Sequence, residues 1–309
     1  MRKLRIPSLL LLLALTAGSA AAQNQDFSKV QVKATQVAGN IYMLQGAGGN
    51  IGASVGPDGI LIVDDQYAPL AEKIRGALRE LSPGNLQFVL NTHWHGDHAG
   101  GNPVFGKEGT IIAHDNVRKR LSTEQTVFGE KVAPLPKEGL PVITFGESLS
   151  IHFNGEEIKA IHFPHGHTDG DSVIFFTAAN VVHMGDDFFA GRFPFVDLGS
   201  GGSVQGLIAN IEKILAEIKP DAKIIPGHGP LSTPADLKEY HRMLVETSGI
   251  VRTKMGAGKD LATIKKEGLP EEWKTWGSGF INTDLWLGIV YESLQGKDPA
   301  HAHGEGTHH

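Results

Sequence analysis

Cysteine is absent from this chain of 309 residues. No disulfide can therefore hold the fold together, and no thiolate can act as a nucleophile or as a metal ligand. Any metal site in this protein must use nitrogen and oxygen atoms.

Positive charge is also scarce, because 28 lysines and arginines stand against 34 aspartates and glutamates, for a net charge of −6. Three of the positive charges, Arg2, Lys3 and Arg5, lie at the extreme N-terminus, and removing them would take the net charge to −9. An acidic chain of this kind is not expected to bind nucleic acid or anionic lipid. The expected partner is a small-molecule substrate.

Long hydrophobic runs are missing apart from residues 9–15, which follow the basic N-terminus and precede the small residues Ala20, Ala21 and Ala22. This order is typical of a secretory signal peptide over residues 1–22, and it predicts a periplasmic or secreted protein. The alternative is a membrane anchor, but the run is shorter than the roughly 18 to 20 residues that a spanning helix needs. We therefore expect no membrane anchor after cleavage.

Low-complexity linkers and internal repeats are likewise missing before the tail, so residues 23–298 are predicted to form one catalytic domain. The histidine-rich residues 299–309 are expected to be a disordered tail, either native or a cloning remnant. Nothing in the sequence indicates the oligomeric state. Hydrophobic periodicity predicts an α/β fold with two sheets covered by outer helices. Strands are expected at residues 30–37, 41–45, 51–55, 59–63, 86–90, 142–145, 149–153, 158–163, 172–176, 181–184 and 222–225, and helices at 70–81, 204–218, 234–251, 261–267 and 280–294.

Residues 91–102 carry four side chains able to bind a metal within six positions: His93, His95, Asp97 and His98. A helix would place the first two about 200° apart, and the neighbouring glycines disfavour helix. The preceding apolar residues 86–90 predict a buried strand, so this cluster is expected in a tight loop at the strand's C-terminal end. The alternative is a solvated histidine-rich loop without function.

Three later segments also place an imidazole or a carboxylate beside glycine after an expected strand. They are residues 164–171 with His165 and His167, 182–187 with Asp186, and 224–230 with His228. If these strands end at one edge of the sheets, all four segments converge on a single site.

In this order and spacing, His-x-His-x-Asp-His followed by Gly-His-Thr, Gly-Asp and Gly-His-Gly resembles the metallo-β-lactamase superfamily, over about residues 35–235. The resemblance implies an αββα sandwich of two mixed sheets flanked by helices, and two Zn²⁺ ions per chain. One zinc would be held by His93, His95 and His167, and the second by Asp97, His98 and His228. Asp186 matches a carboxylate that bridges both metals in many members, Asp97 would also orient the nucleophile, and Asp64 matches a carboxylate behind the metal loop.

Other histidines receive weaker predictions. His165 is the alternative to His167, although the Gly-His-Thr motif favours His167. His162 and His183 are expected to be satisfied in the core or behind the ligands, and His114, His152 and His241 to be structural or exposed.

The pattern is most similar to the exported β-lactamase branch, with two departures. Asp186 replaces that branch's zinc-binding cysteine, and Phe189 replaces its drug-binding lysine. Arg192 is expected to bind a substrate carboxylate instead. Ser200 lies near the position of an oxyanion-stabilising asparagine, and Trp94 is expected at an apolar rim.

The predicted function is a dinuclear zinc hydrolase that uses metal-bound hydroxide to open a lactam, lactone or ester, with β-lactamase-like activity among the candidate reactions. Two alternatives remain open: an iron-dependent oxidoreductase of the persulfide dioxygenase kind, and a periplasmic binding protein without turnover.

Overall fold

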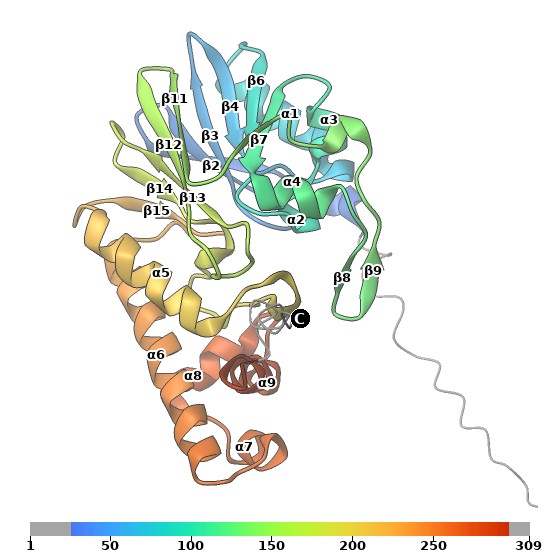
Figure 1. Cartoon of the computed structure of the whole chain (residues 1–309). Helices are drawn as coiled ribbons and strands as arrows, with labels where there is room; N and C mark the ends of the chain where they lie inside the picture. The colour runs from blue at the N-terminus through green and yellow to red at the C-terminus, as the bar shows by residue number, and fades with distance from the viewer. Residues whose placement is uncertain (1–25, 297–309) are drawn as a thin grey trace, which may run out of the picture.

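Two β-sheets lie face to face at the centre of the structure, and helices cover their outer faces (Figure 1). The structure is a computed structural model and describes residues 26–296. The predicted signal peptide and the histidine-rich tail lie outside the described residues. The expected α/β sandwich of two mixed sheets is confirmed.

The first sheet has seven strands; its first three pairs are antiparallel and its last three pairs are parallel. Their order across the sheet is β1 (Lys33–Ala38), β2 (Ile41–Gln45), β3 (Ile51–Gly56), β4 (Gly59–Val63), β6 (Leu86–Leu90), β7 (Thr110–His114) and β10 (Ile143–Phe145). The second sheet is antiparallel except for its last pair. Its order is β11 (Ser148–Phe153), β12 (Glu156–His162), β13 (Ser172–Phe176), β14 (Val181–His183) and β15 (Lys223–Ile225).

Alternating side chains of the strands build two apolar layers. In β4, Leu61 and Val63 face the core between the sheets, whereas Ile60 and Ile62 face α1 (Ala71–Leu81) on the outer side. This division follows from the two-residue period of a strand. Because both faces of β4 are covered, its sequence is apolar throughout.

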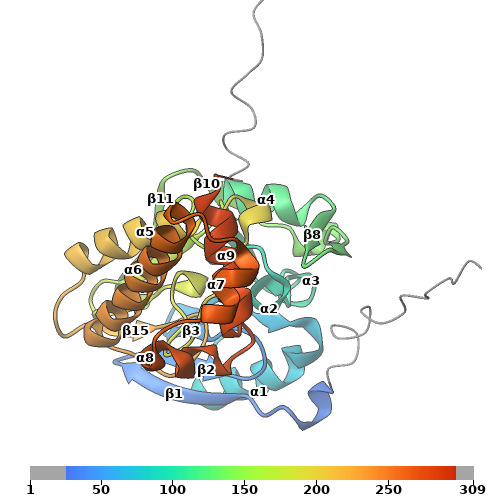
Figure 2. The same ribbon diagram turned by 90° about the horizontal axis from the view of Figure 1, so that it is seen from below.

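Of the helices in the C-terminal half, α5 (Val204–Glu217) and α6 (Pro234–Gly256) lie nearest the second sheet (Figure 1 and Figure 2). The remaining helices pack beyond them: α7 (Leu261–Glu267), α8 (Glu271–Lys274) and α9 (Thr283–Leu294). Thr233 and Asp236 form a capping box that fixes the start of α6. None of the helices in the described part of the chain combines the length and apolarity that a membrane crossing requires.

Several expected boundaries shift, and several elements were not predicted. The helix expected from residue 280 begins at Thr283, because the Asn282 side chain accepts a hydrogen bond from the Leu285 N–H. The prediction of a loop over the metal-binding stretch is partly wrong, since α2 (Gly96–Ala99) is a single helical turn. The unpredicted elements are β5 (Gln66–Tyr67), α3 (Asn102–Phe105), β7, α4 (Asp115–Leu121), the hairpin β8 (Gln125–Val127) and β9 (Glu130–Val132), α8, and the 3-10 helices η1 (Phe27–Lys29), η2 (Ala68–Leu70), η3 (Lys137–Gly139), η4 (Gly185–Asp187), η5 (Leu198–Ser200) and η6 (Thr275–Ser278).

The packing of α9 yields a stability prediction. Trp286 is fully buried, stacks on Phe193 at 5.6 Å, and donates a hydrogen bond of 3.0 Å from Nε1 to Thr247 Oγ1. We expect Trp286→Ala to lower the free energy of unfolding by about 3 to 5 kcal/mol, because it leaves a large cavity. Urea denaturation measures this change. Leu285→Ala, at a neighbouring side chain that is 43% exposed, should change it by less than about 0.5 kcal/mol; equal losses in the two variants would contradict this account of the layer.

Candidate metal centre

The seven predicted metal ligands meet at one edge of the two sheets, each carried by a segment that follows a strand. His93 and His95 follow β6, His167 follows β12, Asp186 lies in η4 after β14, and His228 follows β15. Asp97 and His98 lie on the single turn of α2. The strand ends therefore bring together groups that are far apart in the sequence, as open α/β sheets do.

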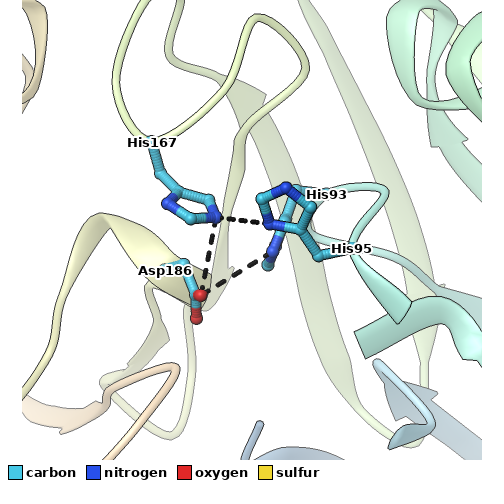
Figure 3. Close-up of side chains that lie close together, drawn as sticks. All are labelled: His93, His95, His167 and Asp186. Carbon is cyan, nitrogen blue, oxygen red and sulfur yellow. Dashed lines mark hydrogen bonds and ion pairs between the residues drawn. The ribbon is translucent and has the colours of Figure 1, made fainter. Parts of the chain in front are cut away.

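The first cluster contains His93, His95, His167 and Asp186, and all four side chains are buried (Figure 3). His95 Nδ1 lies 2.8 Å from His167 Nε2. Asp186 Oδ2 lies 3.5 Å from His167 Nε2 and 3.8 Å from His93 Nε2. One ligand atom from each residue thus faces a common point.

The second cluster contains Asp97, His98 and His228. Asp97 Oδ2 lies 3.2 Å from His228 Nε2 and 3.7 Å from His98 Nε2. Asp186 reaches this cluster as well, since its Oδ1 lies 3.0 Å from His98 Nε2 and 3.4 Å from His228 Nε2. The two oxygens of Asp186 therefore face different clusters, as a bridging carboxylate would.

Four of the imidazoles are held from behind by a polar partner on the ring nitrogen that points away from the site. The pairs are His93 Nδ1 with Thr92 Oγ1 at 3.0 Å, His95 Nε2 with Asp197 Oδ2 at 3.0 Å, His98 Nδ1 with Asp64 Oδ2 at 2.7 Å, and His167 Nδ1 with the Phe195 carbonyl at 2.7 Å. Such partners fix the ring orientation and tautomer of metal-binding histidines. The inward nitrogens are left free to bind a cation.

Asp64 lies behind the metal loop, as the resemblance implies. It is buried, and it also accepts hydrogen bonds from the backbone N–H and the hydroxyl of Thr92, both at 2.7 Å. Asp64 and Gln66 both have positive φ, of 64° and 56°, which is uncommon for residues other than glycine. Between them, Asp65 Oδ1 accepts a bond of 2.8 Å from the Gly101 N–H, so this strained turn ties β4 to the end of the metal loop.

Two glycines permit the close approach of backbone to ligands. A Cβ on Gly49 would lie 2.1 Å from His98 Cε1, and one on Gly227 would lie 2.1 Å from Asp186 Oδ1. Any other residue at these positions would displace a ligand.

The histidine pKa values are shifted in opposite directions in the two clusters. Burial lowers the pKa of His93 well below its usual range and that of His167 to about 4. Burial also opposes the charged form of His98 and His228, but Asp186 and Asp97 outweigh it, raising the pKa of His98 well above its usual range and that of His228 to about 9. Burial would raise the pKa of Asp97, yet the neighbouring His98 and His228 lower it to about 2.

The donor set fits a divalent metal. His93 Nε2 is buried without a hydrogen-bond partner in the described part of the chain, although it faces its cluster, and Asp186 Oδ1 meets only the inward nitrogens of His98 and His228. Uncompensated buried polar atoms are costly, and a bound cation would satisfy them. Imidazole nitrogens and carboxylate oxygens are ligands that Zn²⁺ accepts.

A cleft of about 490 Å³ opens beside the clusters, and its lining includes Trp94, Phe189 and Arg192, which the sequence offers as candidate substrate contacts. Phe189 stacks on the His228 ring at 4.9 Å. Ser200 lies elsewhere: it is buried, and its hydroxyl donates to Asp197 at 2.6 Å, behind His95. The expected oxyanion contact is therefore not available to Ser200 in this conformation. Asp197 orients His95 but is not among the predicted site residues, because its contact with His95 arises only from the tertiary fold.

The histidines with weaker predictions lie outside both clusters. His165 is exposed, and its Nδ1 lies 3.1 Å from the Gly201 carbonyl oxygen. His162 stacks on His114 at 3.6 Å, and His183 Nε2 lies 2.9 Å from the Asn50 carbonyl oxygen. Their ring nitrogens have partners within the protein.

Comparison with known proteins gives several matches. A family model described as the metallo-beta-lactamase superfamily matches residues 35–228. The lactamase-like protein nscB of Arthroderma benhamiae is 28% identical over 218 residues, covering 69% of this chain and 41% of that protein. A metallo-beta-lactamase type 2 of Bacteroides fragilis is 23% identical over 158 residues, covering 51% of this chain and 58% of that protein. The chain spans about half the length of the curated relatives it matches.

Solved structures share the fold. The DIM-1 metallo-beta-lactamase has a TM-score of 0.57 at 18% identity and covers 71% of this chain and 100% of its own. A double mutant of the sec-alkyl sulfatase PisA1 has a TM-score of 0.66 at 15% identity and covers 89% of this chain and 52% of its own. Because the family model spans most of the chain and both metal clusters lie within it, this protein belongs to the metallo-beta-lactamase superfamily.

Proposed function

We propose that this protein is a dinuclear zinc hydrolase that opens a lactam, lactone or ester in the periplasm or outside the cell. The observation that carries the proposal is the position of Asp186, whose two oxygens face two adjoining clusters of metal-binding side chains at the edge of an open cleft. Export rests on the N-terminal sequence, and the small-molecule partner rests on the size of the cleft.

The site residues have different roles in the proposed reaction. Zinc held by the two clusters would lower the pKa of a bound water to about 7 and would polarise a carbonyl oxygen. Asp97 lies at the boundary between the clusters and the cleft, with its side chain 24% exposed and its pKa lowered to about 2. As a permanent carboxylate it can accept a hydrogen bond from the attacking water and hold it towards the cleft. Arg192 lies in the same cleft and can bind an anionic group of the substrate.

Phe189 bears on the choice among substrates. It stands where the β-lactamase branch carries its drug-binding lysine, and its ring covers His228. A carboxylate-bearing β-lactam would then depend on Arg192 alone. We propose that β-lactams are slow substrates and that uncharged lactones or esters are faster.

Hydrolysis is tested with the purified protein and a panel that contains a chromogenic cephalosporin, an acyl-homoserine lactone and a thioester. We expect at least one member of the panel to be hydrolysed, activity to be lost after chelation, and zinc to restore it. Two zinc ions per chain should be found by elemental analysis. Zinc below one ion per chain with no hydrolysis would contradict the proposal, and iron in protein expressed in its native host would favour the oxidoreductase alternative.

The two-cluster assignment predicts which variants lose a metal. Asp97→Ala and His228→Ala should each lower zinc content from two ions per chain to one, and should lower kcat by about a hundredfold or more. His241→Ala is the matched control, since this histidine of α6 pairs with Glu212 of α5 at the surface of the protein. If the Asp97 or His228 variant still binds two ions, the assignment of the second cluster is wrong.

The clusters should also differ in the protons they release on binding zinc. The lowered pKa of His93 and His167 favours neutral rings at pH 7, whereas the raised pKa of His98 and His228 favours charged rings, whose protons a metal must displace. We expect the second ion to release more protons than the first, and its affinity to fall as the pH drops below the His228 pKa of about 9. Calorimetry in two buffers of different ionisation enthalpy measures this release. Equal release for both ions would contradict the electrostatic division.

A further inference from the structure

Three phenylalanines from separate parts of the chain meet at the mouth of the cleft. Phe128 lies at the turn between β8 and β9, Phe195 follows η4, and Phe280 lies between η6 and α9. The rings of Phe128 and Phe195 stack at 4.4 Å with 28° between their planes, and those of Phe128 and Phe280 meet edge to face at 5.4 Å. We call Phe128, Phe195 and Phe280 the aromatic bridge.

The aromatic bridge is continuous with the metal ligands. The Phe195 ring lies 5.7 Å from the His95 ring and 5.8 Å from the His167 ring. Its carbonyl also accepts the hydrogen bond that orients His167. An apolar surface therefore runs from the metal ligands to the solvent-exposed rings of Phe128 and Phe280.

The outer members of the aromatic bridge are unusually exposed for their type. Phe280 is 75% exposed and Phe128 is 55% exposed, although burial of such a side chain contributes about 1.5 to 3 kcal/mol. Phe128 also has a φ of 50°, which is disfavoured for an aromatic residue, and Gly129 follows it with a φ of 79°. Hairpin turns of this kind favour asparagine or glycine at such positions. Exposure and strain thus coincide at a residue that faces the cleft.

The surroundings of the aromatic bridge are apolar. Val127, Val132 and Ile281 line the cleft beside it, while Asp97 and Asp186 lie at the metal end and the cationic Arg192 also lines the cleft. The aromatic bridge itself therefore offers an apolar contact to a flat apolar group.

We propose that the aromatic bridge binds an aromatic or other flat apolar substituent of the substrate. The inference rests on the proposed hydrolase function and narrows its substrate class to lactams, lactones or esters with an extended aromatic group. Phe280 lies beyond residues 35–228, so the C-terminal helical region supplies part of this specificity.

A matched pair of lactones tests the inference. N-phenylacetyl-homoserine lactone and N-acetyl-homoserine lactone differ only in the aromatic ring, and ring opening is followed by proton release. We expect kcat/KM to be about tenfold higher for the phenylacetyl lactone, which corresponds to about 1.4 kcal/mol from ring contacts. Equal kcat/KM for the two lactones in the wild-type protein would overturn the inference.

Variants of the aromatic bridge should change the ratio of the two kcat/KM values by lowering only the value for the phenylacetyl lactone. Phe128→Ala and Phe280→Ala should each lower kcat/KM for the phenylacetyl lactone by about five- to tenfold and change it by less than about twofold for the acetyl lactone. Phe128→Leu keeps an apolar side chain without a flat face and should recover only part of the loss. Val142→Ala, at an apolar side chain that is 72% exposed and outside the cleft, is the control and should change neither. Equal losses on both lactones would overturn the inference.

Binding separates this inference from the hydrolase proposal. Calorimetry with the zinc-loaded protein should show that 4-phenylbutanoate binds about tenfold more tightly than butanoate, and that Phe128→Ala and Phe280→Ala remove the difference. If no member of the lactam, lactone and thioester panel is hydrolysed but this difference is found, the hydrolase proposal fails and the aromatic site stands. If the two carboxylates bind equally to the wild-type protein, the aromatic site is wrong whatever the activity.

Discussion

The fold depends on an electrostatic constraint at the edge where the two sheets meet. Four imidazoles and the carboxylate of Asp186 are buried there within a few ångströms of one another. Burial lowers the pKa of His93, whereas Asp186 lies 3.0 Å from His98 and Asp97 lies 3.2 Å from His228. A divalent cation in each cluster would compensate the carboxylates and satisfy the unpartnered His93 Nε2.

Strand ends position the ligand residues at this edge, and hydrogen-bond partners behind the ligands fix their orientation. The loops that follow β6, β12, β14 and β15 deliver ligands to one edge, and the core between the sheets fixes how far apart the loops lie. Behind the ligands, Asp64 and Asp197 hold His98 and His95 through their outer nitrogens. Because these partners already hold the imidazole rings in place, the rings need to move little when a metal binds.

Sequence reasoning could predict the ligands because their signal is local. His93, His95, Asp97 and His98 occupy six positions after a recognisable buried strand, and each later ligand stands beside glycine at another strand end. The residues that orient the ligands and those that line the cleft come together from distant parts of the sequence. Asp197 meets His95, and Phe280 meets Phe128, only through the tertiary fold, and neither pair has a sequence motif. The short hairpin β8–β9 was missed because its strands have three residues each and little apolar alternation.

The central claim is that one carboxylate, Asp186, joins two adjoining metal sites. A crystal structure of the natively loaded protein, with anomalous data on both sides of the zinc absorption edge, tests it most directly. The account predicts two anomalous peaks per chain: one among His93, His95 and His167 and the other among Asp97, His98 and His228, with one Asp186 oxygen facing each. A single peak, or metal bound without Asp186 between the sites, would contradict it.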